Sequence, residues 1–287
     1  MKIINLISDM QKESLEARRT NKTIGFVPTM GFLHEGHATL IERARKENDI
    51  VILSIFVNPL QFGPNEDFDA YPRDIERDER IARELGVDYL FYPTIEEMYK
   101  EDRTTLITVQ KRVDVLCGKK RPGHFDGVAT VVMKLFQIVM PDFAYFGMKD
   151  AQQVAVIEGL ISDYHLTVNL VRVNTIREED GLAKSSRNVY LSPLERSIAP
   201  AIYQALKMGK QRLEQGDSIS QTKELVESYI TEKTGSEIDY VEIYSYPGLK
   251  EIQKPEDGES LILAVAAKFS KARLIDNIVF SYTKGEN

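Results

Sequence analysis

The chain has 287 residues, 43% of them hydrophobic and 28% charged, with a formal net charge of −7 and a pI near 5.3. This length exceeds the usual single-domain range and favours one large and one smaller domain in an ordinary globular protein. The acidic balance argues against a main role in binding nucleic acid or an anionic membrane surface, so we expect neither as a partner.

The N-terminal segment and the cysteine content favour a cytoplasmic location. Residues 1–19 carry scattered charges without an uninterrupted apolar core, which predicts an amphipathic helix and not a signal peptide. The single cysteine, Cys117, cannot form an internal disulfide, which fits a reducing compartment, and we expect it to be a small buried hydrophobe. The longest apolar run, 261–267, is far shorter than the roughly 20 residues that a membrane-spanning helix needs.

Short β-branched runs alternate with helical patterns along the first part of the chain. A strand is predicted over 23–27, a helix over 36–46 and a nearly continuous apolar strand over 49–57, which together form a βαβ unit. The alternation continues with predicted helices over 73–85, 128–139 and from 150 onward, and with predicted strands over 89–92, 143–146 and 168–173. This pattern predicts an α/β fold with a mostly parallel sheet.

The composition changes to a polar stretch near residue 174. Ser192, Pro193 and Glu195 then have the residue types of an N-cap, a first-turn proline and a capping-box partner. Helical patterns follow to about 214 and over 220–232, and strand-like runs lie at 240–244, 261–267 and 278–282. We therefore predict a large domain over 1–175 and a smaller α+β lid domain over 176–287.

The strongest functional motif lies where the first predicted strand passes into the first helix. It reads Pro28-Thr29-Met30-Gly31-Phe32-Leu33-His34-Glu35-Gly36-His37. Open α/β sheets bind ligands at the carboxyl ends of their strands, and the N–H groups of a following helix suit phosphate. With i,i+3 spacing, His34 and His37 share one helix face and can both donate hydrogen bonds to a polyphosphate.

Two other interpretations of this histidine pair remain open. The pair can cap the helix and pack on its surface without touching a ligand. It can also ligate a metal, but catalytic zinc needs a third protein ligand and a helical pair usually has i,i+4 spacing. The other histidines, His124 and His165, lie in no recognisable metal spacing, so we predict no direct metal motif.

A second motif, Ala183-Lys184-Ser185-Ser186-Arg187-Asn188, joins two hydroxyls with two cations and suits an anion clamp. A solvated loop before a helix is the alternative. Together with the histidine motif, it resembles the paired signatures of the nucleotidyltransferase superfamily, in which HxGH holds ATP and a later Lys/Ser/Arg loop closes on its phosphates. The sequence contains no P-loop and no GxGxxG fingerprint.

Two further motifs follow predicted strands. In 146–153, Lys149 is placed to reach phosphate oxygens and Gln153 to offer an amide to a carboxylate or hydroxyl. The alternative makes Asp150 a plain N-cap and leaves Lys149 in solvent. In 55–62, Gln61 falls at the same predicted edge, and the alternative is an ordinary hydrogen-bonding loop residue.

Six segments occur in the order typical of the pantoate–β-alanine ligase (pantothenate synthetase) family: PTMGFLHEGH, SIFVNPLQF, YPRD, RPGHFDGV, FGMKDAQQ and SSRN. The chain resembles this family from about residue 3 to its end, although the part after Leu191 contributes little. The resemblance implies a homodimer whose subunit has a Rossmann-like N-terminal domain and a smaller C-terminal lid. It also implies that ATP, with Mg²⁺, and (R)-pantoate give pantoyl-adenylate and pyrophosphate, and that β-alanine then attacks, releasing AMP.

The family pattern also implies roles for individual residues. His37 occupies the position of a proton donor, and His34, Lys149 and Arg187 join it as catalytic residues that offset charge on the phosphate. Gln61 and Gln153 map to pantoate, with Gln61 also near β-alanine. The residues that map to ATP are Met30, Gly31, Phe32, Leu33, His34, Glu35, Gly36, His37, Gly147, Met148, Lys149, Asp150, Ile176, Lys184, Ser185, Ser186 and Arg187.

The sequence departs from the family pattern at two of these positions. Lys184 stands where Met or Leu often precedes the serine pair, and Met148 stands where Glu or Gln is frequent. Neither change removes a cation of the motifs. Lys184 can contact phosphate, or the loop can bind through its main-chain N–H groups alone.

Three other functions share parts of this pattern. A nucleotidyltransferase that leaves the nucleotide on its product uses the same ATP motifs. A fragment of a tRNA-charging enzyme also activates a carboxylate, but the sequence lacks a basic RNA-binding module. A non-catalytic ATP sensor binds the nucleotide without turnover. The products formed from ATP separate these alternatives.

Overall fold

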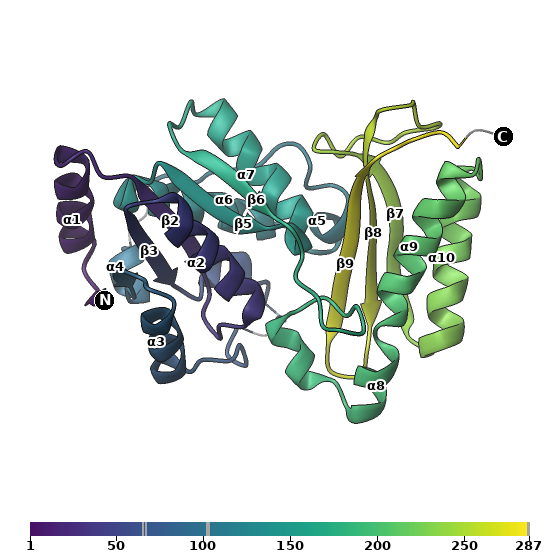
Figure 1. Cartoon of the computed structure of the whole chain (residues 1–287), viewed down its shortest axis with the longest axis horizontal. Helices are drawn as coiled ribbons and strands as arrows, with labels where there is room; N and C mark the ends of the chain where they lie inside the picture. Colours follow the sequence, from purple (N-terminus) through teal and green to yellow (C-terminus); the bar gives the residue numbers. More distant parts are fainter. Residues whose placement is uncertain (65, 67, 102–103, 286–287) are drawn as a thin grey trace. The chain divides into compact units, whose positions relative to one another are not determined.

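The computed structural model of the chain describes residues 1–64, 66, 68–101 and 104–285. The chain forms two compact units (Figure 1). The first unit contains residues 1–111, 121–148 and 156–174, and the second contains 112–120, 149–155 and the chain from Thr175 onward. The short segments 112–120 and 149–155 thus belong to the second unit, although the chain returns to the first unit after each of them. The domain boundary between residues 175 and 176 stays a prediction.

The described part of the first unit contains a six-stranded parallel sheet in the order β1-β4-β3-β2-β5-β6. Starting from β2, the chain forms β3 and β4 on one side, whereas β5 and β6 lie on the other side of β2. The direction of winding therefore reverses between β2 and β5, and open parallel sheets bind ligands at such a point. The strands are β1 (Lys2–Ile4), β2 (Ile24–Thr29), β3 (Ile50–Ile55), β4 (Tyr89–Phe91), β5 (Phe143–Gly147) and β6 (Asn169–Val173).

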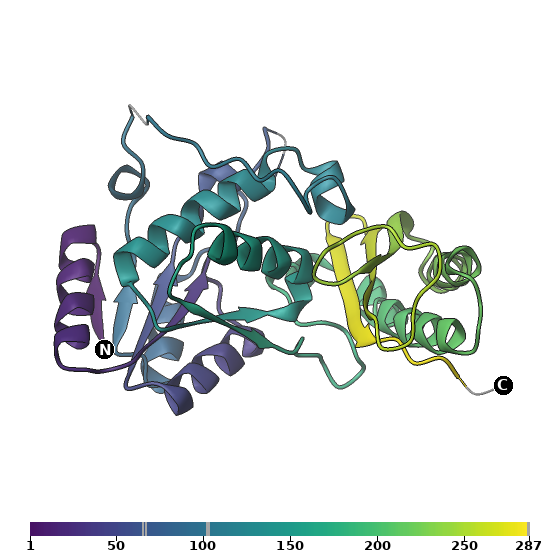
Figure 2. The ribbon, with the colours of Figure 1, turned by 90° about the horizontal axis from the view of Figure 1, so that it is seen from above.

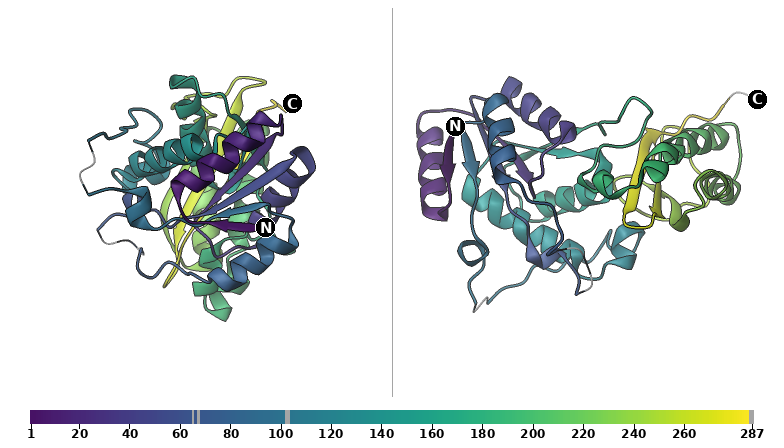
Figure 3. Two further views of the ribbon diagram at one scale, coloured as in Figure 1. Left: turned by 90° about the vertical axis from the view of Figure 1, so that its left-hand side faces the viewer. Right: turned by 90° about the horizontal axis from the view of Figure 1, so that it is seen from below.

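Helices of the first unit cover both faces of this sheet. α2 packs on β2 and β5, and α6 contacts β2 from the opposite face (Figure 2). α1 packs against α6 (Figure 3). The elements are α1 (Ile7–Arg19), α2 (Glu35–Glu47), the 3-10 turn η1 (Pro59–Gln61), α3 (Ile75–Glu84), α4 (Ile95–Met98) and α6 (His124–Val139).

Burial in the core of the first unit explains why apolar strand segments alternate with amphipathic helices in its sequence. All six residues of β3 are buried, as expected for a parallel strand covered on both faces. α2 turns Leu40, Ile41 and Ala44 toward the core and leaves its charged face exposed. Each large apolar side chain buried in this way contributes about 1.5–3 kcal/mol to the stability of the fold. In α2, this burial outweighs the weak tendency of so short a helix to form on its own.

The second unit contains an antiparallel sheet in the order β7-β8-β9, packed against α9 and α10. Residues 261–267 of the central strand β8 are all buried. Gly209 allows α9 and α10 to meet, because an added Cβ would lie 2.5 Å from Val226 Cγ2. The elements are α8 (Pro193–Ile198), α9 (Ala201–Glu214), α10 (Ile219–Thr234), β7 (Glu237–Ser245), β8 (Ser260–Lys268) and β9 (Arg273–Ser281).

Three segments that precede α8 contribute short elements to the fold: α5 (Leu116–Lys120), η2 (Met148–Asp150) and η3 (Ser186–Tyr190). α7 (Ala151–Asp163) begins in the second unit and continues in the first. Within the second unit, Cys117 is buried as expected, and its Sγ lies 3.2 Å from the hydroxyl of Tyr240. Burial raises the pKa of the Tyr240 hydroxyl.

The predicted fold class is confirmed, and the differences lie at short elements and ends. Residues 2–4 lie within the helix predicted over 1–19 but form the three-residue edge strand β1 beside β4, and α1 begins only at Ile7. β9 begins at Arg273 and not near Ile278. The capping box of Ser192 and Glu195 at the start of α8 is present as predicted. No helix within the described ranges is long and apolar enough to cross a membrane.

Candidate active site

The histidine motif begins with a sharp turn at the carboxyl end of β2. Gly31 and Phe32 both adopt left-handed backbone angles, with φ of 85° and 51°. The hydroxyl of Thr29 accepts the N–H of Gly31 at 3.1 Å and donates to the carbonyl of Ser54 on β3 at 2.8 Å. Glycine is required at position 31, because a Cβ would meet Asp78 and Ile55 at 3.0 Å in a strained conformation.

Asp78 of α3, which belongs to no functional motif of the sequence, fixes the next two residues. Asp78 is 1% exposed, and its two carboxylate oxygens accept the N–H groups of Phe32 and Leu33 at 2.7 Å each. Burial raises the pKa of this carboxyl, and the two N–H groups partly offset that effect. A sequence signal existed, since Asp78 lies i+3 from Ile75 and i−4 from Ala82 on the apolar face of α3.

His34 and His37 cap the start of α2 and lie against each other. His34 Nδ1 accepts the N–H of Gly36 at 3.1 Å, and His37 Nδ1 accepts the N–H of His34 at 3.3 Å. The rings stack with centroids 4.0 Å apart and an interplanar angle of 29°. Because Nδ1 is an acceptor in both rings, each neutral imidazole carries its proton on Nε2. The capping hydrogen bonds therefore fix the tautomer in which both rings carry an Nε2–H donor.

Gln61 lies in η1, just beyond the carboxyl end of β3, and is 9% exposed. Its Nε2 lies 3.2 Å from the sulfur of Met30, so the structure brings these two predicted site residues together. Its Oε1 accepts a hydrogen bond from buried Asn58 at 3.0 Å. Asn58 lies in the segment 55–62, but no sequence pattern predicted a role for it. The histidine pair and Gln61 thus follow two neighbouring strands of one sheet.

Gly147 ends β5 and Met148 follows it in the first unit, next to β2 in the sheet. The side chain of Leu33 is fully buried in the core, and its N–H donates to Asp78. The first unit therefore holds Met30 to His37, Gln61, Gly147 and Met148 around the point where the winding of the sheet reverses.

The second unit holds the other predicted site residues. Lys149 is in η2, with its side chain 19% exposed and its Nζ 3.9 Å from a carboxylate oxygen of Asp150. Its main-chain carbonyl accepts a hydrogen bond from Asn277 of β9 at 2.9 Å. Gln153 lies half-buried in the first turn of α7. Asn277 was not identified from the sequence, and it anchors the main chain of a predicted phosphate-binding lysine.

The loop that carries the serine pair folds back on itself within the second unit. The N–H of Lys184 bonds the carbonyl of Ile176 at 2.9 Å, and its Nζ lies 2.7 Å from the carboxylate of Glu178. Ser185 caps η3 by accepting the N–H of Arg187 at 3.2 Å. Lys184, the departure from the family pattern, therefore has an ion-pair partner in the same loop.

Arg177 and Asp276 anchor this loop to the sheet of the second unit. The guanidinium donates to both oxygens of the carboxylate at 2.6 and 2.9 Å, and it lies 3.5 Å from the ring centroid of Tyr203. Asp276 also accepts the N–H of Asn277, its neighbour in β9. The same two residues of β9 thus hold the loop and the main chain of Lys149.

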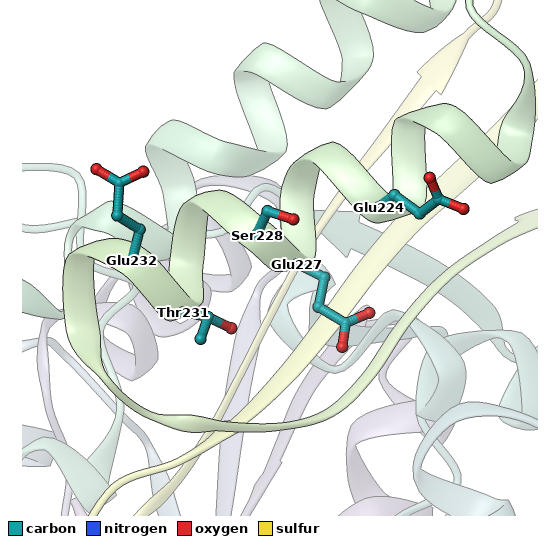
Figure 4. A pocket seen from close by; sticks show the side chains of 5 residues that line it. All are labelled: Glu224, Glu227, Ser228, Thr231 and Glu232. Atoms are coloured by element: carbon teal, nitrogen blue, oxygen red, sulfur yellow. The ribbon is translucent and has the colours of Figure 1, made fainter.

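One further surface depression does not match a nucleotide site. A depression along α10 is lined by Glu224, Glu227, Ser228, Thr231 and Glu232 (Figure 4), and these carboxylates would repel a triphosphate. Within the described ranges, no three His, Cys, Asp or Glu side chains converge to hold a metal ion.

A parallel sheet with a histidine-capped helix at its point of reversal defines a nucleotide-binding α/β protein of the HxGH type. The model of the pantoate-β-alanine ligase family matches residues 2–279, and the chain belongs to that family. It is 63% identical to the pantothenate synthetase of Geobacillus sp. (strain WCH70) over 279 residues, which cover 97% of this chain and 98% of that protein. The chain is therefore a ligase, as the sequence motifs predicted.

Solved structures agree with this assignment. The crystal structure of pantothenate synthetase from Thermus thermophilus is 44% identical, has a TM-score of 0.89, and covers 97% of this chain and 99% of its own. The pantoate-β-alanine ligase of Francisella tularensis, crystallised with beta-gamma ATP and β-alanine, is 35% identical with a TM-score of 0.80, and 97% of each chain is covered. These matches confirm the predicted family and fold.

Proposed function

We propose that the chain condenses (R)-pantoate with β-alanine to form pantothenate at the expense of ATP. Pantoate attacks the α-phosphate to give pantoyl-adenylate and pyrophosphate, and β-alanine then displaces AMP. The observation that carries this proposal is the match across 97% of the chain with a pantothenate synthetase, at 63% identity. The Francisella ligase, crystallised with an ATP compound and β-alanine, supports the same substrates.

The histidine pair suits the first step. The attack brings a carboxylate to a phosphate and builds negative charge on the phosphate oxygens, which fixed donors must offset. His34 and His37 offer Nε2–H donors whose orientation is set by the main chain of α2. We assign His37 as the proton donor to phosphate, with His34, Lys149 and Arg187 as the other catalytic residues.

We also propose main-chain and side-chain groups that bind ATP. At the turn of Gly31 and at the start of α2, the phosphates of ATP can approach the main chain closely. The loop of the serine pair supplies hydroxyl groups and cations. The proposed ATP-binding residues are Met30, Gly31, Phe32, Leu33, His34, Glu35, Gly36, His37, Gly147, Met148, Lys149, Asp150, Ile176, Lys184, Ser185, Ser186 and Arg187. Gln61 and Gln153 bind pantoate, and Gln61 also lies near β-alanine.

Mg²⁺ accompanies ATP in this proposal. The ion usually keeps several waters and binds substrate phosphates with one or two carboxylates. The carboxylate of Asp150, half-exposed and 3.9 Å from Lys149 Nζ, is an oxygen donor of that kind. The bound ion would neutralise part of the phosphate charge.

We further propose that the protein acts as a homodimer in the cytoplasm. Its substrate ATP and its free thiol at Cys117 fit a reducing, ATP-rich compartment. Light scattering coupled to size-exclusion chromatography tests the oligomer directly. A mass near 32.7 kDa, that of one chain, would contradict the dimer.

The products of ATP test the proposed reaction. With pantoate and β-alanine present, AMP should appear one-for-one with pantothenate, because attack at the α-phosphate releases pyrophosphate. Chromatography of the nucleotides distinguishes AMP from ADP. Stoichiometric ADP would indicate an acyl-phosphate ligase, and binding of ATP without any product would indicate a sensor. A panel of small carboxylic acids in place of pantoate measures substrate selectivity.

A further inference from the structure

The segment Arg121–Val128, RPGHFDGV, has no role in the chemistry described above, yet it contacts Gln61. His124 Nδ1 lies 2.7 Å from the main-chain carbonyl of Gln61, and an Arg121 nitrogen donates to the same carbonyl at 3.3 Å. Gly127 has its carbonyl 3.0 Å from Asn58 Nδ2, the group that also donates to the side chain of Gln61. One segment thus holds Gln61 directly at its main chain and indirectly at its amide.

The partners of His124 determine where its proton lies. A carbonyl only accepts, so Nδ1 carries the proton that bonds Gln61. Nε2 lies 3.0 Å from Arg121, whose guanidinium only donates, so Nε2 is the acceptor. Arg121 is in turn held by a two-point ion pair with Glu66. Burial alone would raise the pKa of Glu66, but the Arg121 bond and charge outweigh it and lower that pKa.

The partners of Asn58 determine which way its amide faces. Its Nδ2 donates to the carbonyl of Gly127, and its Oδ1 accepts the N–H of Leu60 at 3.3 Å and the hydroxyl of Tyr99 at 2.8 Å. A flipped amide would set two acceptors against each other at Gly127 and two donors at Leu60. Asn58, at 1% exposed, therefore presents an N–H to Gln61 in one orientation only.

Asn58 in turn sets the polarity of Gln61. The Gln61 oxygen is used by the Asn58 N–H, so the amide nitrogen points the other way, toward the sulfur of Met30. A thioether is a weak acceptor and does not compete strongly with a ligand oxygen. Gly127 permits the arrangement, since a Cβ there would lie 2.3 Å from the carbonyl oxygen of Leu60.

We propose that residues 121–127, together with Asn58, form a positioning element that makes Gln61 a hydrogen-bond donor to an acceptor oxygen of the carboxylate substrate. His124 is the positioning residue, acting through the main chain of Gln61. This inference rests on the proposed function, because it assigns the polarity with which pantoate is recognised. A site that presents a donor discriminates strongly against a group with the wrong polarity.

Two substitutions of Gln61 test its polarity. Gln61→Glu keeps an oxygen for the Asn58 N–H but replaces the donor with a carboxylate, whereas Gln61→Ala removes both groups. Steady-state KM values for pantoate and ATP are measured at about pH 8, where the new carboxyl is ionised. We expect Gln61→Glu to raise the pantoate KM by about 100-fold or more and to be worse than Gln61→Ala. If the pantoate KM of Gln61→Glu is lower than that of Gln61→Ala, Gln61 is an acceptor and the inference is wrong.

Three variants test the role of His124. His124→Ala removes the ring's hydrogen bonds to Gln61 and Arg121, whereas His124→Asn keeps a donor at the position of Nδ1. We expect His124→Ala to raise the pantoate KM by about tenfold with little change in the ATP KM, and His124→Asn to recover most of that loss. The matched control is His165→Asn, at an exposed position with left-handed φ that asparagine accepts. Equal changes in both KM values, or no recovery in His124→Asn, would reduce His124 to a structural residue.

The activity of the wild-type protein distinguishes a failure of the proposed function from a failure of the positioning inference. If it forms no pantothenate from ATP, pantoate and β-alanine, the proposed function itself fails. If it does, and the Gln61 and His124 variants behave like the wild type toward pantoate, the positioning inference alone fails. Thermal melts of each variant show whether a loss of activity reflects unfolding.

Discussion

His34 and His37 show how a single atom decides what a residue offers to a ligand. Each uses Nδ1 as an acceptor for a main-chain N–H at the start of α2, so each presents Nε2–H. The i,i+3 spacing in the sequence predicted a shared face, which the stacked rings confirm. It did not predict the tautomer, because that depends on which backbone N–H groups the turn at Gly31 and Phe32 directs at the rings.

The phosphate donors are tested by truncation. His37→Ala and Lys149→Ala should each lower kcat by roughly two to three orders of magnitude, as expected when one oriented donor is lost from a charged transition state. Rates are measured under saturating ATP and pantoate, and folding is checked by thermal melting. Lys46→Ala, at an exposed position on α2, is the matched control. Near-normal turnover in both truncated variants would remove them from the phosphate site.

Asp78 provides a second prediction at this scale. Asp78→Asn is nearly isosteric, but its amide has one acceptor for the two N–H groups of Phe32 and Leu33. One buried N–H then loses its partner, which costs about 1–3 kcal/mol, and the turn before His34 loosens. We expect a lower melting temperature and a higher KM for ATP. Glu76→Gln, exposed on the same helix, is the control, and an unchanged ATP KM in Asp78→Asn would separate Asp78 from the site.

At the scale of elements, periodicity and caps were sufficient for most of the fold. The nearly continuous apolar run over 49–57 predicted a strand, which β3 confirms over Ile50–Ile55, and Ser192 with Glu195 predicted the start of α8. β1 was missed because three residues carry no periodicity, and its pairing with β4 joins distant parts of the sequence. Asp78 and Asn58 were missed for a related reason, since their roles depend on backbone groups that only the tertiary fold brings near them.

The start of α8 also predicts a pH dependence. Glu195 accepts the N–H groups of Ser192 and Ser270 at 2.8 and 2.7 Å, and these bonds lower its pKa from 4.5 to about 2. A lowered pKa means that the folded state favours the ionised form. The resulting stability is therefore present above about pH 4.5 and is lost as the pH falls toward about 2.

Glu195→Gln tests this dependence, because glutamine has one acceptor oxygen for the two N–H groups. The difference in melting temperature between wild type and variant should be largest near neutral pH and should shrink from about pH 5 to about pH 3. Glu227→Gln, exposed on α10, is the control (Figure 4). A difference that stays constant over this range would show that ionisation of Glu195 does not stabilise the fold.

At the scale of the whole molecule, the residues proposed to bind ATP are divided between two compact units. The histidine motif belongs to the first, whereas Lys149 and the loop of the serine pair belong to the second. The sequence predicted a second domain after residue 175, but it gave no sign that 112–120 and 149–155 join the second unit. Such membership depends on long-range contacts, for example that of Lys149 with Asn277, which no local pattern encodes.

The order of the chemistry is tested on the intact protein. If pantoyl-adenylate forms before the amine reacts, labelled pyrophosphate should exchange into ATP with pantoate present and β-alanine absent. The exchange requires only the first half-reaction and its reversal, so the amine is dispensable. Gln61→Ala should slow the exchange by impairing pantoate placement, and it should slow the full reaction at least as much. Exchange that requires β-alanine, once release of pyrophosphate has been shown to be fast enough to observe, would favour a concerted mechanism. Normal exchange together with a normal overall rate in Gln61→Ala would place Gln61 outside the site.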